Sequence, residues 1–191
     1  MGWRDRGYLP HFDRPGLVQS VNFRLSDAVP DAVIQGWLDE LRYETEEARL
    51  RELRKRITRY EDVGYGCCVL RETVAAQLVE GALRHFEGVR YRLHAWVVMP
   101  NHLHVLFEPT IVWTLGKIIG SWKTYTSRRI HEGFPESCHP LWQREYFDRF
   151  IRDDEHFWNE VAYIENNPVK AGLASDAASF RWSSAFNRSE S

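Results

Sequence analysis

The stretch VVMPNHLHVLFEP, residues 97–109, decides how the middle of the chain folds. It is apolar enough for a buried strand, but Pro100 and Asn101 interrupt it, so we expect two strands joined by a tight turn. The strand after the turn begins with His102 and His104, which are one leucine apart. Because side chains alternate along a strand, both histidines should lie on the same face of the sheet. Two neutral imidazoles on one face can bind a divalent metal ion, so this pair is a candidate metal site.

The spacing alone does not decide between a metal site and two ordinary histidines on the open face of a sheet. A third ligand and a nucleophile or base from another element would decide it. The late segment DDEHFWNEVAYIENNP, residues 153–168, predicts a helix that begins with aspartates and ends at a proline. At about 100° per residue, Tyr163 and Asn167 share one side of this helix, away from the apolar stripe of Val161 and Ile164. A tyrosine on a helix flank and an asparagine before a proline are also common without any function.

The remaining apolar segments predict an α+β fold around the hairpin. We expect a first strand at residues 17–25, helices at 72–86 and 114–134, and a further strand at 144–151. With the two arms of the hairpin, the order is β, α, β, β, α, β and a last helix. This order is typical of a sandwich in which helices pack on one face of an antiparallel sheet.

A charged segment at about 31–62 is not needed for that order. Most of it, DELRYETEEARLRELRKRITRYED (residues 39–62), mixes acidic and basic side chains at helix-forming positions. Such a pattern usually marks a solvated helix face. We therefore expect a single domain over residues 1–191 that carries a charged helical insertion.

Length and composition exclude several classes of protein. With 191 residues, 43% of them hydrophobic, the chain can form one compact core. It has no run of roughly 18 apolar residues, and its start lacks the apolar segment of a secretory signal, so we expect a cytoplasmic protein without a membrane partner. The net charge of -2 does not indicate a nucleic-acid binder in bulk, so any such function must depend on local charge.

Cysteine and glycine patterns exclude two further kinds of site. Cys67 and Cys68 are adjacent and Cys138 is distant, which gives neither a disulfide framework nor a Cys-x-x-Cys zinc motif. The stretch LGKIIGSWK lacks the glycine and Lys-Ser/Thr spacing of a phosphate-binding loop. We therefore expect no nucleotide cofactor.

Several long motifs resemble the REP-associated tyrosine transposases, which belong to the HUH single-tyrosine transposases. The similarity is carried by WVVMPNHLHVLFEP and by LWQREYFDRFIRDDEHFWNEVAYIENNPVKAGL. It also includes RGYLPHFDRPGLVQSVNFRL near the start and GCCVL before the helix expected at 72–86, so it covers most of the chain. Motifs this long and this numerous are specific.

The resemblance implies a fold, a site and a reaction. The fold is a ferredoxin-like α+β sandwich with the histidine pair on a central strand and the tyrosine on a late helix. His102, His104 and Asn167 would bind Mg²⁺ or Mn²⁺, and Tyr163 would be the nucleophile. Related insertion-sequence enzymes often have glutamine where this chain has Asn167. The implied reaction cleaves and rejoins single-stranded DNA at hairpin, REP-like sequences with a short flanking recognition sequence, through a 5′-phosphotyrosine.

Two other tyrosines are weaker candidates for the nucleophile. Tyr125 also lies on a predicted helix after the histidines, but the residue one turn later is Arg129 rather than an amide. Tyr146 lies among strand-like residues and is expected to pack in the core.

Local positive charge offers candidate DNA contacts. These candidates are Lys117, Lys123, Arg128, Arg129, Arg144, Arg149, Arg152, Lys170, Arg4 and Arg6. Scattered basic residues are most often only solvated, and this is the alternative for each of them. The charged insertion remains open as a dimer contact, an extra DNA clamp or neither, and the chain as a monomer or a homodimer.

Two rival functions remain at the level of the sequence. One is a protein of the same fold that binds DNA hairpins without cleaving them. The other is an unrelated metal hydrolase that uses water on phosphodiesters. A covalent protein–DNA species separates both rivals from a tyrosine transposase.

Overall fold

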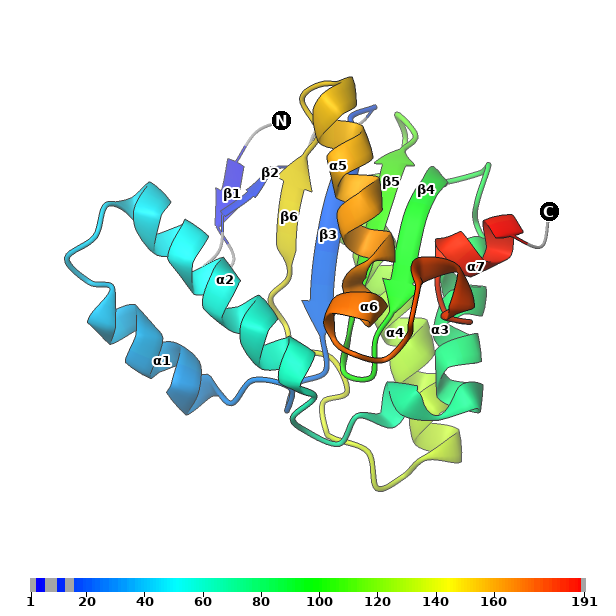
Figure 1. Ribbon diagram of the computed structural model, residues 1–191, viewed down its shortest axis with the longest axis horizontal. Coiled ribbons are helices and arrows are strands. Elements are labelled where there is room, and N and C mark those ends of the chain that lie inside the picture. Colours follow the sequence, from blue (N-terminus) through cyan, green and yellow to red (C-terminus); the bar gives the residue numbers. More distant parts are fainter. Residues whose placement is uncertain (1–2, 6–9, 13–15, 190–191) are drawn as a thin grey trace.

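A four-stranded antiparallel sheet is the centre of the computed structural model, which describes residues 3–5, 10–12 and 16–189 (Figure 1). Its strands in spatial order are β4 (Tyr91–Val98), β5 (His102–Pro109), β3 (Gln19–Arg24) and β6 (Phe147–Phe150). Apart from the helices of the charged insertion, one α-helix lies between β3 and β4 and another between β5 and β6, which is the ferredoxin-like arrangement. The predicted α+β fold is confirmed, and β5 is a central strand. Two short strands, β1 (Trp3–Asp5) and β2 (Pro10–Phe12), pair separately.

Helices α3 (Thr73–Arg84) and α4 (Leu115–Gly133) cover one face of the sheet. Strand β5 directs Leu103, Val105 and Phe107 into this layer, where all three are fully buried. Their partners on α4 include Ile118 and Trp122, which are fully or almost fully buried. This layer is the main apolar core.

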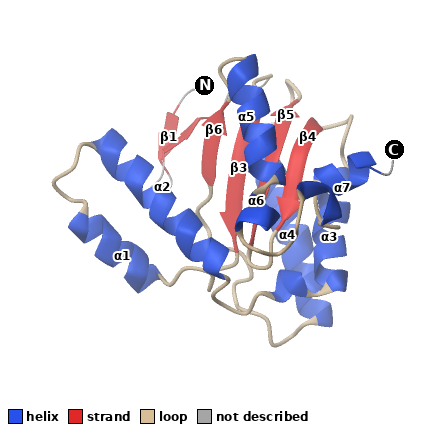
Figure 2. Cartoon of the chain, in the orientation of Figure 1, coloured by secondary structure: helices blue, strands red, loops and turns tan. Residues whose placement is uncertain are grey.

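Helix α5 (Asp154–Glu165) crosses the other face, so helices cover both faces rather than the one face expected (Figures 1 and 2). Its apolar stripe packs Val161 and Ile164 against Leu106 of β5. The short helix α6 (Asn167–Lys170) follows after a break at Asn166. Near the C-terminal end, the last turns are η2 (Ala177–Ser179) and α7 (Ser184–Ser189).

The charged segment forms two helices, α1 (Asp31–Glu40) and α2 (Glu46–Val63), rather than a continuous one. The chain turns at residues 41–45, and Thr45 caps α2 by accepting a hydrogen bond from the Ala48 N–H (3.3 Å). The prediction of a mainly solvated face was incomplete, because Leu53 and Ile57 are fully buried against Phe147. Helix α2 therefore lies beside β6 on the α5 side of the molecule (Figure 1).

Helix α3 buries a stripe that includes Ala75 and Val79, whereas Val74 is exposed. The short helix η1 (Val69–Arg71) precedes α3 in the chain. In the described part of the chain, no helix is both long and apolar enough to cross a membrane.

Candidate metal and nucleophile site

The polar face of the sheet carries the two histidines side by side. His102 and His104 are buried, with ring centroids 5.1 Å apart and ring planes at 84°. The neighbouring strand β3 places Arg24 opposite His102 and Asn22 opposite His104. Burial lowers the pKa of His102 well below its usual value and that of His104 to about 3. Both imidazoles are therefore neutral at pH 7, the form that binds a metal ion.

Asn101, in the hairpin turn, sets the tautomer of His102. Its Nδ2 donates to two backbone carbonyls, that of Glu61 in α2 (3.2 Å) and that of Tyr65 just after α2 (3.0 Å). Its Oδ1 must then accept, so the His102 Nδ1, 2.8 Å away, carries the proton. The His102 Nε2 keeps a lone pair and has no hydrogen-bond partner among the described residues. A buried, unpartnered imidazole nitrogen of this kind suits a metal ligand.

Asn22 has a similar role toward His104. Its Nδ2 donates to Glu61 Oε2 (3.2 Å) and lies 3.4 Å from His104 Nε2, so that nitrogen is also in the acceptor form. Glu61 comes from α2 and lies 3.9 Å from the guanidinium of Arg24. Burial raises the pKa of Glu61 to about 7, although Arg24 opposes the shift. The polar face thus has a buried supporting layer of an amide, a carboxylate and a guanidinium.

Tyr163 of α5 lies against the second histidine. Its ring centroid is 5.6 Å from that of His104, at an interplanar angle of 89°. Burial raises the pKa of Tyr163 to about 12, and the carboxylate of Asp62 adds to the shift. The ammonium of Lys170 lies 4.4 Å from the centre of the same ring. At neutral pH the phenol therefore keeps its proton unless a further cation stabilises the phenolate.

Asn167, the predicted third ligand, is buried at the start of α6. Its Nδ2 donates to the carbonyl of Tyr163 (3.0 Å) and more distantly to that of Ile164 (3.5 Å). These bonds satisfy carbonyls at the end of α5 and orient the amide. The amide oxygen is the acceptor atom that these bonds leave over.

A cavity of about 480 Å³ opens beside Tyr163 and His104. Helix α2 lines it with Arg54, Lys55 and Arg59, and the β6 side adds Arg149. Sequence reasoning missed the three α2 cations, although positions 54, 55, 58, 59 and 62 form one side of a helix. The charged insertion therefore contributes a basic wall to the site.

The alternative tyrosines lie elsewhere. Tyr125 is half exposed and lines a different cavity, of about 670 Å³, between α3 and α4. Tyr146 is buried in the apolar core, as expected. The histidine pair projects from the opposite face of the sheet, so Tyr163 is the tyrosine that the fold brings to it.

The predicted DNA contacts divide between the two sides of the sheet. Arg149 and Lys170 lie at the site, and Arg152 is exposed just before α5. Arg144 is exposed in the connection between α4 and β6. Arg6 lies outside the described residues, and of Arg4 the structure describes only the backbone, in β1.

The four candidates on α4 belong to the far side. Lys117 is exposed there, and Arg128 and Arg129 both contact Glu132, at 3.3 and 2.5 Å. Lys123 donates to the carbonyls of Gln143 (2.8 Å) and Arg144 (3.2 Å), so its ammonium is engaged within the protein.

The donors at the histidine pair fit a divalent ion. Among the described residues the His102 Nε2 offers an unpartnered lone pair, and an ion at the His104 Nε2 would replace its 3.4 Å contact with Asn22 Nδ2. An amide oxygen, water or phosphate oxygens can complete the coordination of Mg²⁺ or Mn²⁺. A second group of possible metal ligands lies away from the histidines. Among the described residues, it consists of Asp27, Cys67 and Cys138, whose ligand atoms lie within 4.8 Å of one another.

Comparisons with known proteins bear on the family and the fold. The family model of IS200-like transposases matches residues 67–167. The REP-associated tyrosine transposase of Escherichia coli (strain K12) is 28% identical over 95 residues, which cover 49% of this chain and 53% of that protein. The chain spans about half the length of the curated relatives it matches. A solved REP-associated tyrosine transposase bound to a REP hairpin superposes with a TM-score of 0.61 over 93% of this chain and 81% of that one, and at 16% identity this similarity supports the fold alone.

Proposed function

The chain belongs to the IS200-like transposase family, and we propose that it is a metal-dependent tyrosine transposase that cleaves and rejoins single-stranded DNA. The observation that carries this proposal is the contact between the rings of Tyr163 and His104 on the face where both histidines are neutral. A nucleophile beside a metal site at the edge of a basic cavity is the arrangement that phosphodiester chemistry requires.

His102 and His104 would hold Mg²⁺ or Mn²⁺, with the Asn167 amide oxygen as a third ligand. When bound, the ion would polarise a non-bridging oxygen of the scissile phosphate. The Tyr163 oxygen attacks phosphorus, the bond to the 3′ oxygen breaks, and a 5′-phosphotyrosine and a free 3′-OH result. Because the bond energy is retained, the reverse attack by a 3′-OH rejoins DNA without a nucleotide cofactor.

The surroundings of Tyr163 regulate when it reacts. Burial raises its pKa, and Asp62 and Glu160 add to the shift, so the phenol is a poor nucleophile in the free protein. Lys170 and the bound cation would offset these carboxylates once substrate is in place. The phenol would therefore be activated only in the complete complex.

The DNA substrate is proposed to be a hairpin of the REP type with a short flanking single strand. The relatives' names and the hairpin bound by the structural neighbour suggest this class. Arg54, Lys55 and Arg59 of α2 are placed to contact phosphates that enter the cavity, with Arg149 on the facing wall. The position of these side chains favours a role for the charged insertion in binding DNA rather than in forming a dimer.

The test uses end-labelled, hairpin-bearing single-stranded DNA with Mn²⁺ or Mg²⁺, analysed on a denaturing gel. Wild type and Tyr125→Phe should form a covalent adduct, and Tyr163→Phe should form none. Cleavage without an adduct would instead identify a hydrolase that uses water. Tight hairpin binding without cleavage by the wild type would identify a catalytically silent DNA-binding protein.

A further inference from the structure

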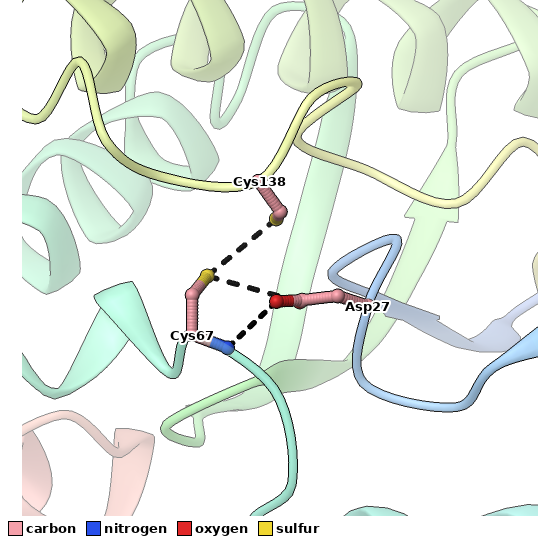
Figure 3. A group of neighbouring side chains, drawn as sticks. All are labelled: Asp27, Cys67 and Cys138. Atoms are coloured by element: carbon pink, nitrogen blue, oxygen red, sulfur yellow. Dashed lines mark hydrogen bonds between the residues drawn. The ribbon is translucent and has the colours of Figure 1, made fainter.

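Three connections meet below the sheet and bring together two thiols and a carboxylate that the proposed reaction does not use (Figure 3). Asp27 follows β3, Cys67 lies between α2 and η1, and Cys138 lies between α4 and β6. The Cys67 Sγ is 3.5 Å from the Cys138 Sγ and 3.7 Å from Asp27 Oδ1. Asp27 and Cys138 are 40 and 71 positions from Cys67 along the chain, so no spacing motif could reveal the group.

The backbone around the cluster is arranged to hold it. The Cys67 N–H donates to Asp27 Oδ2 at 2.7 Å, which orients the carboxylate and leaves Oδ1 toward the sulfur. Gly66 has φ +89°, and a Cβ there would come within 2.8 Å of Asp27 Oδ1. Only glycine permits this conformation and this close approach together. The Ser26 N–H also bonds to the Leu141 carbonyl (2.9 Å), which ties the Asp27 turn to the Cys138 connection.

The distances match those of ligands around one metal ion. A tetrahedral zinc ion with Zn–S bonds of about 2.3 Å and a Zn–O bond of about 2.0 Å holds its sulfurs about 3.8 Å apart and a sulfur and oxygen about 3.5 Å apart. The observed separations are 3.5 Å for the sulfurs and 3.7 Å for sulfur and oxygen. The Cys138 Sγ and the Asp27 carboxylate lie within 4.8 Å of each other, so one ion could contact all three ligand atoms after small side-chain adjustments.

We propose that Cys67, Cys138 and Asp27 form a second metal site, separate from the histidine pair, that binds Zn²⁺. Thiolates select a soft cation such as zinc over Mg²⁺ or Mn²⁺, so the two sites differ in the metal they take. Cys67 is exposed, which leaves room for a water molecule as the fourth ligand. On binding, both thiols release their protons to solvent, and the ion is held by two thiolates and one carboxylate.

Such a site would hold together two segments that support the polar face. It links the segment after β3, the strand that carries Asn22, to the segment after α2, the helix that carries Glu61. Because zinc binding must displace the two thiol protons, zinc affinity should increase as the pH rises from about 6 to about 8.

The experiment is a titration of the chelator-treated, reduced full chain with Zn²⁺, and in parallel with Co²⁺, whose thiolate complexes absorb strongly in the near ultraviolet. Wild type should bind one Zn²⁺ at the thiols, show the cobalt–thiolate band and gain several degrees in Tm. Cys67→Ser and Cys138→Ser should lose the band, and Asp27→Asn should bind at least roughly tenfold more weakly while it keeps both thiols.

Two control variants test whether the metal binds at these three residues. Cys68→Ser is the matched control, because its sulfur faces the Gly64 carbonyl (3.2 Å) rather than the cluster, and it should bind zinc like wild type. His102→Ala/His104→Ala removes the other metal site and should keep the cobalt–thiolate band. The proposal is overturned if wild type shows no such band, or if the band survives in Cys67→Ser. It is equally overturned if the two thiols form a disulfide in air and bind no metal after reduction.

Discussion

The two faces of the same strands have opposite chemistry. In β5, Leu103 and Phe107 enter the apolar layer under α3 and α4, while His102 and His104 face α5 and α2. The polar face is not open to solvent, because both histidines, Arg24 and Glu61 are almost completely buried. Burial stabilises the apolar side, whereas on the polar side it costs desolvation energy that hydrogen bonds and ion pairs only partly return. One face therefore mainly stabilises the fold, and the other holds neutral, oriented imidazoles beside the apolar contacts of α5 with Leu106.

The largest effect should come from the polar face. His102→Ala and His104→Ala should each reduce DNA cleavage by about a thousandfold or more, because the polarising ion is worth several kcal/mol. Hairpin affinity should stay within a few fold, since phosphate contacts dominate binding. Cleavage rates and titrations at fixed salt measure the two effects. His94→Ala, on β4 and near Glu108 (3.9 Å), is the control and should cleave normally. An equal loss of binding in the histidine variants would contradict this division.

The apolar face should respond in stability instead. Phe107 is fully buried between Tyr91 and Trp122, with ring centroids at 5.7 and 5.0 Å. Phe107→Ala should lower the free energy of unfolding by about 3–5 kcal/mol through lost burial and a cavity. Urea unfolding measures this loss. At a temperature where the variant remains folded, its cleavage rate should approach that of wild type. A loss below about 1 kcal/mol would mean that this layer is not the main core.

Positive charge around the cavity should distinguish the faces more modestly. Arg54→Ala/Arg59→Ala removes two cations from the cavity wall and should weaken hairpin binding roughly tenfold, with a shallower dependence on salt. Arg128→Ala/Arg129→Ala on α4 is the matched pair on the far side and should change affinity little. Filter binding at several salt concentrations compares them. The opposite ranking would place the DNA on the α4 side.

The smallest expected effect is a pH dependence of stability on the apolar side. Burial and Arg24 lower the pKa of Lys123 to about 7 in the folded chain, against an ordinary value near 10.5. Between these values the unfolded chain binds more protons, so this residue makes stability rise with pH. The unfolding free energy of wild type minus that of Lys123→Met should therefore increase from about pH 7 to about pH 9. A difference that stays constant would show that the lysine keeps its ordinary pKa.

The sequence predicted what depends on local periodicity. The strand that begins at His102 matches residues 102–109 in the structure, and the helix predicted at 114–134 begins at Leu115 and ends at Gly133. The alternation of side chains in β5 and the angular position of Tyr163 made them candidates for one site, and the resemblance to the HUH single-tyrosine transposases paired them.

The sequence did not predict contacts between distant segments. Asn22 and Glu61 support His104 from a strand and a helix that were recognised only as secondary structure. Mixed charges made α2 look solvated, because its few buried positions, such as Leu53 and Ile57, are outnumbered by charged ones. The Asp27–Cys67–Cys138 cluster arises where three connections meet, and no periodic pattern describes such a meeting.

The helix layers on the two faces of the sheet also differ in when they can form during synthesis. Helix α3, the hairpin and α4 occupy one unbroken segment, residues 73–133, whereas the polar face needs α2 from before it and α5 from after it. Contacts between neighbours in sequence form faster than those between distant segments. On the ribosome, the apolar layer can therefore assemble while Tyr163 is still being synthesised. A partly made chain would be compact before the proposed site is complete, because that site forms only when the late helix docks.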